Sequence, residues 1–318
     1  MKISVLGCGR WGSFHAWYAA SLGHDVTLWG RESSLNMATL KKTRKNEYLT
    51  LQDAILLTTD LKLAIERADI CVISISAQQL RSFVVDIKKL GASPKPLILC
   101  MKGLEADSGK RLTEVVDEEL GEKWPTVVWV GPGHVQDFIK GIPNCMVMAS
   151  NNNELTQRIV DVFNGRLIRF YYGEDLLGVE IGAAAKNVVG LAAGMLDGLG
   201  CASLKGALMS RGTRELSRLI AKMGGDAKTV YGLSHLGDYE ATLFSQHSNN
   251  RRYGENYIKK IPMTKLAEGV NTSKALVALA KQYEVELPIC ETVCNIVCHG
   301  ADPKSALDSL FLRSIKTE

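Results

Sequence analysis

The chain has 318 residues, of which 46% are hydrophobic, and a formal net charge of +4. This length is too great for one typical core and predicts two domains. Lysines and arginines alternate with acids and form no basic stripe, which argues against nucleic-acid binding. No signal peptide precedes the first predicted strand, and no apolar run approaches the roughly 18 residues of a membrane span, so we expect a soluble cytoplasmic protein.

A glycine-rich motif follows the first predicted strand, residues 2–6. Gly7, Gly9 and Gly12 have the spacing Gly-x-Gly-x-x-Gly, and a helical stretch follows them. In dinucleotide-binding sites the first glycine permits a tight turn, the second lets the backbone approach the pyrophosphate, and the third lets the helix pack closely on the strand. The N–H groups at the start of that helix face the phosphates. The motif therefore predicts a dinucleotide-binding site.

The second predicted strand, residues 25–29, ends where an NAD-preferring site carries an acid that binds the ribose hydroxyls. This chain has Arg31 followed by Glu32 instead. Arg31 can stack on adenine or pair with a 2′-phosphate, which favours NADP, while Glu32 keeps NAD open. The alternative interpretation of Arg31 is an ordinary exposed arginine at the end of a strand.

Short β-branched runs alternate with helical stretches over residues 1–173. The further predicted strands are 70–75, 96–100, 126–130, 145–148 and 167–171. This alternation predicts an α/β, Rossmann-like N-terminal domain with a doubly wound sheet. Strand signals then stop, and residues 174–318 predict an all-α C-terminal domain with the substrate site between the two domains.

Two segments that follow predicted strands can bind a ligand, because ligands of open α/β sheets bind at the carboxyl ends of the strands. Lys102 follows one strand, and Gly131-Pro132-Gly133 follows the next. The glycines would let a ligand approach backbone N–H groups. His134, beside them, is either a proton relay or a hydrogen-bonded loop residue.

Lys186 is a lone amine in a run of small and apolar residues, 182–194. Burial in such surroundings disfavours the ammonium and lowers its pKa toward the range in which it exchanges protons near neutral pH. Lys186 is therefore a candidate general acid/base. The alternative is that glycines and alanines let a second helix approach closely while Lys186 extends to water.

The stretch 236–254 collects polar groups. Asp238 and Thr242 come first, and Ser248-Asn249-Asn250-Arg251 then offers hydroxyl, amide and guanidinium donors that suit a phosphate. A solvated loop is the alternative interpretation of this second group.

The eight cysteines have no framework of spacings, which indicates free thiols in a reducing compartment. Cys290, Cys294 and Cys298 share one helical face with His299 beside them, which raises a metal site as one interpretation. They alternate with apolar residues, and buried free cysteine behaves as a small hydrophobe, so we expect a core stripe and no metal.

Nine motifs, in this order and at these intervals, resemble the bacterial-type NAD(P)-dependent glycerol-3-phosphate dehydrogenases over essentially the whole chain. The motifs are Gly7 to Gly12 with Trp11, Trp29-Gly30-Arg31, Lys102-Gly103-Leu104-Glu105, Gly131-Pro132-Gly133, Gly182-Ala183-Ala184-Ala185-Lys186-Asn187, Arg211-Gly212-Thr213-Arg214-Glu215, Leu236-Gly237-Asp238, Asn250-Arg251-Arg252-Tyr253-Gly254 and Ala267-Glu268-Gly269.

The resemblance implies an oxidoreductase that interconverts sn-glycerol 3-phosphate and dihydroxyacetone phosphate with NADP or NAD, and that supplies phospholipid synthesis. It implies that Lys186 accepts the proton during alcohol oxidation. The residues implied to bind the substrate are Lys102, Gly131, Gly133, Asn187, Asp238, Thr242, Ser248, Asn249, Asn250 and Arg251. Those implied to contact the cofactor are Gly7, Gly9, Arg10, Trp11, Gly12, Arg31, Lys102, Val135, Asn249, Leu266 and Glu268.

Two departures from the family pattern concern the site. The family usually has Ser-Arg-Asn where this chain has Ser248-Asn249-Asn250, so the arginine expected at position 249 is missing. Asparagine carries no charge and makes a weaker phosphate contact. Either Arg251 takes over this contact or the affinity for phosphate is lower. The second departure is Gly133-His134-Val135, where the family commonly has serine, phenylalanine and alanine.

Two rival functions remain open on the sequence alone. A hydroxyacid or hydroxyalkyl dehydrogenase of the same architecture would reduce a ketoacid and ignore dihydroxyacetone phosphate. A non-catalytic cofactor sensor would bind NADPH without turnover, although Lys102, Lys186 and Asp238 together argue against it. The sequence also leaves open the NAD or NADP preference, the physiological direction, and whether the chain forms a homodimer.

Overall fold

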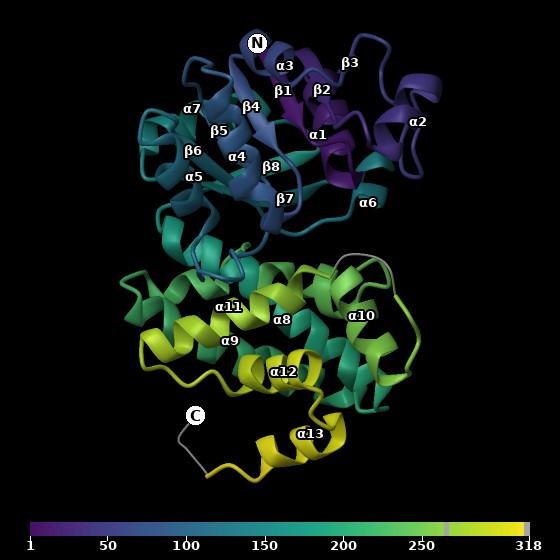
Figure 1. Cartoon of the computed structure of the whole chain (residues 1–318). Helices are drawn as coiled ribbons and strands as arrows, with labels where there is room; N and C mark the ends of the chain where they lie inside the picture. The colour runs from purple at the N-terminus through teal and green to yellow at the C-terminus, as the bar shows by residue number, and fades with distance from the viewer. Residues whose placement is uncertain (264–266, 315–318) are drawn as a thin grey trace. The chain divides into compact units, whose positions relative to one another are not determined.

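A computed structural model of the chain describes residues 1–263 and 267–314, which form two compact units (Figure 1). The first unit contains residues 1–101 and 112–176, and the second contains residues 102–111 and the described residues from 177 onward. The chain thus passes into the second unit after residue 176, whereas the predicted domain boundary lies after residue 173. The transfer of residues 102–111 to the second unit was not expected. Its physical cause is Leu104, which is fully buried in the apolar core of the second unit.

The first unit is built on one eight-stranded sheet in the order β3-β2-β1-β4-β5-β6-β7-β8. The strands are β1 (Lys2–Leu6), β2 (Asp25–Trp29), β3 (Leu56–Thr58), β4 (Ile70–Ile73), β5 (Leu97–Leu99), β6 (Thr126–Val130), β7 (Asn144–Ala149) and β8 (Ile168–Gly173). All neighbouring pairs are parallel except β6 and β7. The predicted doubly wound sheet is confirmed, and the short edge strand β3 is an addition to the predicted strands.

Helices connect these strands, and three of them begin at side-chain caps. They are α1 (Arg10–Ser21), α2 (Leu35–Thr43), α3 (Leu61–Arg67), α4 (Leu80–Lys89), α5 (Leu112–Leu120), α6 (Val135–Ile139) and α7 (Asn153–Phe163). Ser34, Asp60 and Asn152 each accept a hydrogen bond from a backbone N–H in the first turn of α2, α3 and α7. Such caps satisfy donors that a helix cannot pair internally.

Aromatic side chains hold α1 in the core of the first unit. Phe14 stacks on Tyr18 of the same helix at 5.9 Å between ring centroids and on Phe138 of α6 at 5.0 Å. Trp129 of β6 packs on Phe163 of α7 at 5.1 Å. None of these five side chains is more than 1% exposed. Because α1 is fixed this firmly, its N-terminus, which carries the glycine motif, is fixed with it.

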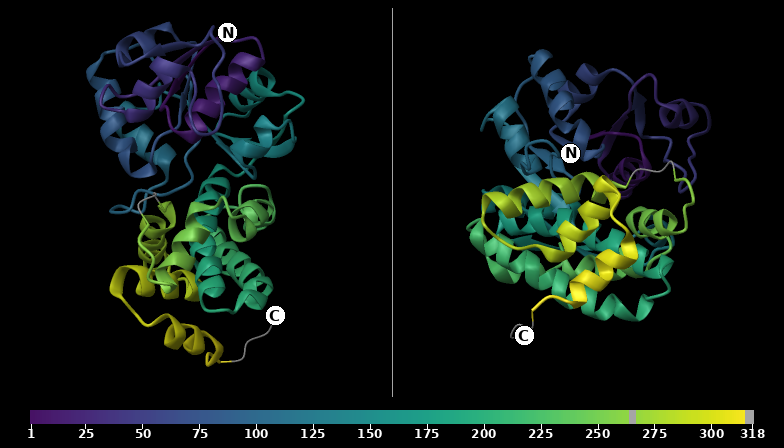
Figure 2. Two further views of the ribbon diagram at one scale, coloured as in Figure 1. Left: turned by 90° about the vertical axis from the view of Figure 1, so that its right-hand side faces the viewer. Right: turned by 60° about the horizontal axis from the view of Figure 1, so that its bottom comes forward.

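The described residues of the second unit form helices and loops without a strand, as the views in Figure 2 show, and the predicted all-α domain is confirmed. Its α-helices are α8 (Leu176–Gly198), α9 (Lys205–Lys222), α10 (Asn249–Ile258), α11 (Glu268–Gln282), α12 (Pro288–His299) and α13 (Pro303–Phe311). Between α9 and α10 lie 3₁₀ turns at Ala227–Tyr231 and Leu236–Asp238 and a π-helix at Glu240–Phe244.

Helix α8 is the core helix of the second unit. Among the described helices, only α8 is long and apolar enough, by length and composition, to cross a membrane. The prediction that no apolar run approaches the length of a membrane span is therefore wrong for this helix. However, 94% of its most apolar stretch is buried inside the protein. A Cβ atom on Gly194 would lie 1.8 Å from the carbonyl oxygen of Arg251, and one on Gly254 would lie 2.0 Å from that of Leu191. The glycines of α8 and α10 therefore allow the two backbones to touch.

Candidate active site

The three glycines of the first motif meet three different surroundings. Gly7 has a φ of +123°, and a Cβ there would lie 2.2 Å from the carbonyl oxygen of Ser74. A Cβ on Gly12 would lie 1.8 Å from the carbonyl oxygen of Gly7. At Gly9, by contrast, a Cβ would meet nothing within 4 Å. The fold thus requires Gly7 and Gly12, whereas Gly9 faces open space at the start of α1, as a backbone that receives a pyrophosphate must.

The turn after β2 lies against this motif. A Cβ on Gly30 would lie 2.4 Å from the sulfur of Cys8, so Arg31, the next residue, is close to the motif. Arg31 is exposed. Arg10, at the first position of α1, places its guanidinium 5.7 Å from the ring centroid of Tyr48. Two arginines thus flank a helix N-terminus, which suits an anionic dinucleotide.

The second glycine loop, Gly131-Pro132-Gly133, has a backbone conformation that favours glycine at its first and third residues. Gly131 and Gly133 both have a φ of +136°, and a Cβ on Gly133 would lie 2.5 Å from the ring of Phe138. Val135 is 1% exposed, and His134 accepts backbone hydrogen bonds at its carbonyl from the first turn of α6. Packing therefore accounts for Gly133 and Val135, and the contacts of this loop with substrate or cofactor stay predictions.

Two lysines and one carboxylate form a largely buried cluster in the second unit. Lys186 Nζ and Lys102 Nζ each lie 2.7 Å from the same atom, Asp238 Oδ2. Lys186 Nζ also donates a hydrogen bond of 2.7 Å to Thr242 Oγ1. The Lys186 side chain is 8% exposed, that of Asp238 2% and that of Lys102 19%. Lys186 does not extend to water, so this part of the alternative interpretation is wrong, whereas the close approach of a second helix to α8 is present.

The pKa of Lys186 is lowered to about 8, because burial and the Lys102 ammonium lower it by more than Asp238 raises it. Desolvation is the largest cause, because a buried ammonium loses its hydration. A pKa in this range means that both the amine and the ammonium are populated near neutral pH. Such a group can both give and accept a proton during turnover.

A ladder of amides connects this cluster to its surroundings. Asn187 Nδ2 donates to the backbone carbonyl of Lys102 at 2.6 Å, and Asn250 Nδ2 donates to Asn187 Oδ1 at 2.9 Å. The N–H of Gly269 donates to Asn250 Oδ1 at 3.0 Å. The ladder joins the 102–111 loop, α8, α10 and α11. Asn187 and Asn250 therefore use their side chains to fix the backbone that carries Lys102.

Sequence reasoning missed a histidine–tyrosine pair beside this cluster. His235 Nδ1 lies 2.9 Å from the carbonyl oxygen of Gly182, and Tyr239 Oη lies 2.7 Å from His235 Nε2. A carbonyl only accepts, so Nδ1 carries the proton and Tyr239 donates to Nε2. Burial lowers the pKa of His235 to about 4, so it stays neutral near Lys186. The available signal was its position three residues before Asp238.

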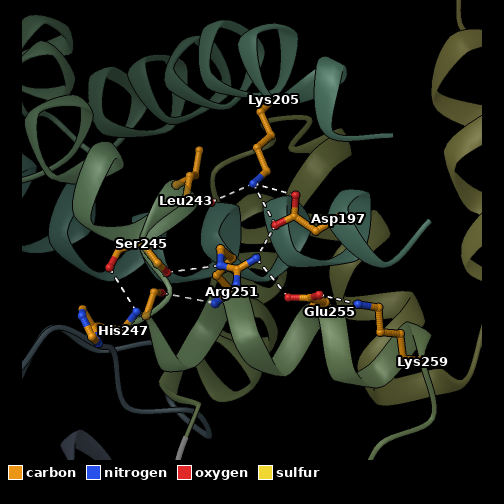
Figure 3. Close-up of polar contacts among 9 residues, drawn as sticks. Asp197, Lys205, Leu243, Ser245, His247, Arg251, Glu255 and Lys259 are labelled. Carbon is orange, nitrogen blue, oxygen red and sulfur yellow. Dashed lines mark hydrogen bonds and ion pairs between the residues drawn. The ribbon is translucent and has the colours of Figure 1, made fainter. Parts of the chain in front are cut away.

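Of the four consecutive residues predicted to hold phosphate, Ser248, Asn250 and Arg251 make internal contacts. Ser248 caps α10 by accepting from the N–H of Arg251 at 3.3 Å, and Asn250 belongs to the amide ladder. Arg251 pairs with Asp197 and Glu255 (Figure 3). Asn249 is half-buried at the first position of α10.

Several other predicted residues can be placed. Trp11 is half-buried on α1, and Glu268 is half-buried at the first position of α11. Leu266 lies outside the described residues. All eight cysteines are free, and Cys290 and Cys294 are buried, with Cys290 in the core of the second unit. Among the residues that the structure describes, no group of three or more metal-binding side chains comes together.

A glycine-motif unit with a doubly wound sheet, joined to a helical unit with a buried lysine–aspartate pair, defines a nicotinamide-dependent dehydrogenase. The family model for the N-terminus of NAD-dependent glycerol-3-phosphate dehydrogenase matches residues 2–156, and that for the C-terminus matches residues 175–308. The chain belongs to this family and is an NAD(P)-dependent oxidoreductase.

Relatives of similar length support this membership. The chain is 37% identical to glycerol-3-phosphate dehydrogenase [NAD(P)+] of Fusobacterium nucleatum, covering 100% of this chain and 98% of the relative. It is 38% identical to the protein of the same name from Geobacillus kaustophilus, covering 100% of this chain and 96% of that protein.

Solved structures show the same fold. The crystal structure of glycerol-3-phosphate dehydrogenase from Coxiella burnetii is similar, with a TM-score of 0.91 and 28% identity, and the match covers 98% of this chain and 99% of that one. D-mandelate dehydrogenase in complex with NADH shares the fold at a TM-score of 0.66 and 14% identity, with 98% and 100% covered. The architecture thus carries more than one dehydrogenase, and the substrate must be argued from the site.

Proposed function

We propose that the chain interconverts sn-glycerol 3-phosphate and dihydroxyacetone phosphate in the cytoplasm, with Lys186 as the general acid/base, and supplies glycerol 3-phosphate for phospholipid synthesis. The observation that carries this proposal is the buried cluster in which Lys186 and Lys102 share Asp238. Family membership and the names of the full-length relatives support the substrate.

Lys186 moves the proton in this proposal. In the reductive direction its ammonium polarises the ketone and donates a proton to the oxygen that becomes the alcohol. In the oxidative direction the neutral amine accepts that proton. Asp238, only 2% exposed, keeps the lysine side chain in place at 2.7 Å and favours its charged form. Thr242 holds the same nitrogen from a second side.

Lys102 binds the substrate in this proposal. Its side chain is more exposed than those of Lys186 and Asp238, so it is the member of the cluster most open to an incoming molecule. Two ammonium groups on one carboxylate leave the cluster with an excess positive charge. This charge attracts a phosphorylated substrate and stabilises negative charge that develops on the carbonyl oxygen.

The cofactor residues are proposed from the first unit. The backbone N–H groups at the start of α1, next to Gly9, would hold the pyrophosphate, and Arg10 and Arg31 would contact the rest of the dinucleotide. When bound, the nicotinamide supplies and accepts the hydride. The protein contributes orientation and the transfer of the proton.

One assay tests the proposed function. Nicotinamide absorbance is followed with dihydroxyacetone phosphate, with NADH and NADPH compared, and with a panel of ketoacids in parallel. We expect turnover of dihydroxyacetone phosphate in preference to every ketoacid. Reduction of a ketoacid without turnover of dihydroxyacetone phosphate would assign the chain to the hydroxyacid dehydrogenases, and cofactor binding without any turnover would indicate a sensor.

A further inference from the structure

Three helices of the second unit contribute to an ion cluster outside the Lys186 site (Figure 3). Asp197, near the end of α8, lies 2.8 Å from Lys205 Nζ and 2.5 Å from Arg251 Nη1. Arg251 Nη1 also lies 3.0 Å from Glu255 Oε2. The side chains of Asp197, Lys205 and Arg251 are at most 15% exposed, so water screens these pairs poorly. We call Asp197, Lys205 and Arg251 the Asp197 cluster.

Both cations of the Asp197 cluster also bind backbone carbonyls. Lys205 Nζ donates to the carbonyl oxygen of Leu243 at 3.0 Å, and Arg251 Nε donates to that of Ser245 at 3.2 Å. These carbonyls lie at the C-terminal end of the π-helix Glu240–Phe244, where helix carbonyls lack intrahelical partners and cations are favourable. Asp197 orients both cations and thereby fixes this end of the π-helix.

Residues 242–251 contain the two carbonyls bound by the Asp197 cluster and also Arg251 itself. This segment makes two contacts with the Lys186-Asn187 pair. Thr242, directly before Leu243, accepts the hydrogen bond from Lys186 Nζ at 2.7 Å. Asn250, directly before Arg251, donates to Asn187 at 2.9 Å. The backbone of Arg251 also lies directly on α8 at Gly194. A shift of the Asp197 cluster would therefore displace partners of both Lys186 and Asn187.

We infer that Asp197, Lys205 and Arg251 are positioning residues for Lys186, and that Arg251 does not supply the phosphate contact expected of an arginine at position 249. The Arg251 guanidinium has Asp197 and Glu255 as partners and donates to Ser245. A substrate phosphate would have to displace these groups from a buried charge, which costs more than their exchange at a surface. The inference rests on the proposed function, because it concerns how that reaction holds its acid/base.

Steady-state kinetics of Asp197→Asn and Arg251→Gln test the inference. We expect each variant to lower kcat for reduction of dihydroxyacetone phosphate by about tenfold, with KM changed by less than about threefold. The double variant should lose no more than about twofold beyond the worse single variant, because residues that act as one unit are not additive. A KM raised by about thirtyfold or more in Arg251→Gln at unchanged kcat, with normal kinetics in Asp197→Asn, would overturn the inference.

The pH profile separates positioning of Lys186 from a merely structural role. Thr242 accepts from the Lys186 ammonium, so loss of that contact disfavours the charged form. The limb of the kcat profile that belongs to Lys186 should therefore move to lower pH in both variants. A limb that stays at its wild-type pH contradicts the inference.

Lys259→Met is the matched control, because Lys259 pairs with Glu255 at the outer edge and its side chain is 46% exposed. We expect its kinetics to stay within about twofold of wild type. Circular dichroism and NADPH binding report folding. If Arg251→Gln does not fold, Arg251→Lys decides. Lysine retains the charge but lacks the planar group whose Nε donates to the Ser245 carbonyl while Nη1 pairs with Asp197, so we expect a lowered kcat. A wild-type chain that ignores dihydroxyacetone phosphate refutes the proposed function, whereas an active wild type with a pure KM defect in Arg251→Gln refutes only this inference.

Discussion

The glycine motif of the first unit and the lysine cluster of the second are assembled in opposite ways. Gly7, Gly9 and Gly12 lie within six residues of one another, in a single strand-to-helix turn. The members of the lysine cluster come from three distant segments. Lys186 lies on the long helix α8, Asp238 in a 3₁₀ turn, and Lys102 in the segment 102–111, which follows the strands of the first unit in the chain but belongs to the second unit. A site built from one turn can be recognised by spacing, whereas a site built from distant segments exists only once the chain is folded.

The two sites also differ in how they tolerate change. At Gly7 and Gly12 of the glycine motif, backbone atoms fill the space that a side chain would need, so sterics decide the outcome of a substitution there. In the lysine cluster, burial and the charges of Asp238 and Lys102 set the pKa of Lys186, so electrostatics decide the outcome of a substitution. Variants of the glycine motif therefore test steric fit, whereas variants of the lysine cluster test the electrostatic control of the Lys186 pKa.

The largest effect is expected for Lys186→Ala. Without the acid/base, kcat in both directions should fall by at least about a hundredfold, while the affinity for NADPH stays close to wild type. Stopped-flow and fluorescence titration measure the two quantities. Lys222→Ala, at the exposed end of α9, serves as control. Near-normal turnover in Lys186→Ala would remove the residue from the proton transfer.

Two alanine substitutions in the glycine motif should have different consequences. Gly12→Ala places a methyl group on the carbonyl of Gly7 and should destabilise the first unit by about 3 kcal/mol. Gly9→Ala meets open space and has a φ of −76°, so stability should stay within about 1 kcal/mol, while affinity for NADPH falls about tenfold. Thermal unfolding and cofactor titration measure both. Equal loss of stability in the two variants would contradict this division.

A smaller effect concerns the pH dependence set by Lys102. In the wild type, oxidation of glycerol 3-phosphate should accelerate as the pH rises through about 8, because only the neutral amine of Lys186 accepts the proton. Reduction should slow over the same range. Since Lys102 lowers the pKa of Lys186, Lys102→Gln should move both transitions to higher pH. A transition that stays in place would show that another group titrates.

The smallest effect is expected for Asn249→Arg. A guanidinium at the start of α10 adds a charge-assisted contact for the substrate phosphate, and should lower KM for dihydroxyacetone phosphate about three- to tenfold at unchanged kcat. Asn249→Gln, which lengthens the side chain without adding charge, is the control. If both variants match the wild type, phosphate does not reach this position.

Much of the first unit could be predicted because its signals are local. The strands at residues 2–6 and 25–29 were predicted to the residue, since buried parallel strands are short apolar runs. Strand β3 was missed because three residues at a sheet edge, partly exposed, carry little pattern. Of the lysine cluster, Lys186 could be singled out by its apolar surroundings and Lys102 by its position after a buried strand, whereas the grouping of both lysines with Asp238 required the family resemblance.

The residues that were missed share a physical reason. His235 Nε2 and Tyr239 Oη pair with each other inside the core, and Asp197 pairs with both Lys205 and Arg251. Pairing of this kind depends on distances between segments that the sequence does not supply. For the same reason Arg251 looked like a ligand for phosphate in the sequence, while in the structure its charge is already engaged.

Residues 102–111 belong to the second unit although the residues on both sides of them belong to the first, and this limits how the chain can be cut into fragments. The chain passes between the units after residues 101, 111 and 176, so no single cut yields two complete halves. A fragment of residues 174–318 would lack Lys102, and it would also lack Leu104, which belongs to its own core. The units are therefore not interchangeable modules: a dehydrogenase that borrows this helical half by a single recombination event inherits neither the complete proton-transfer site nor a complete core.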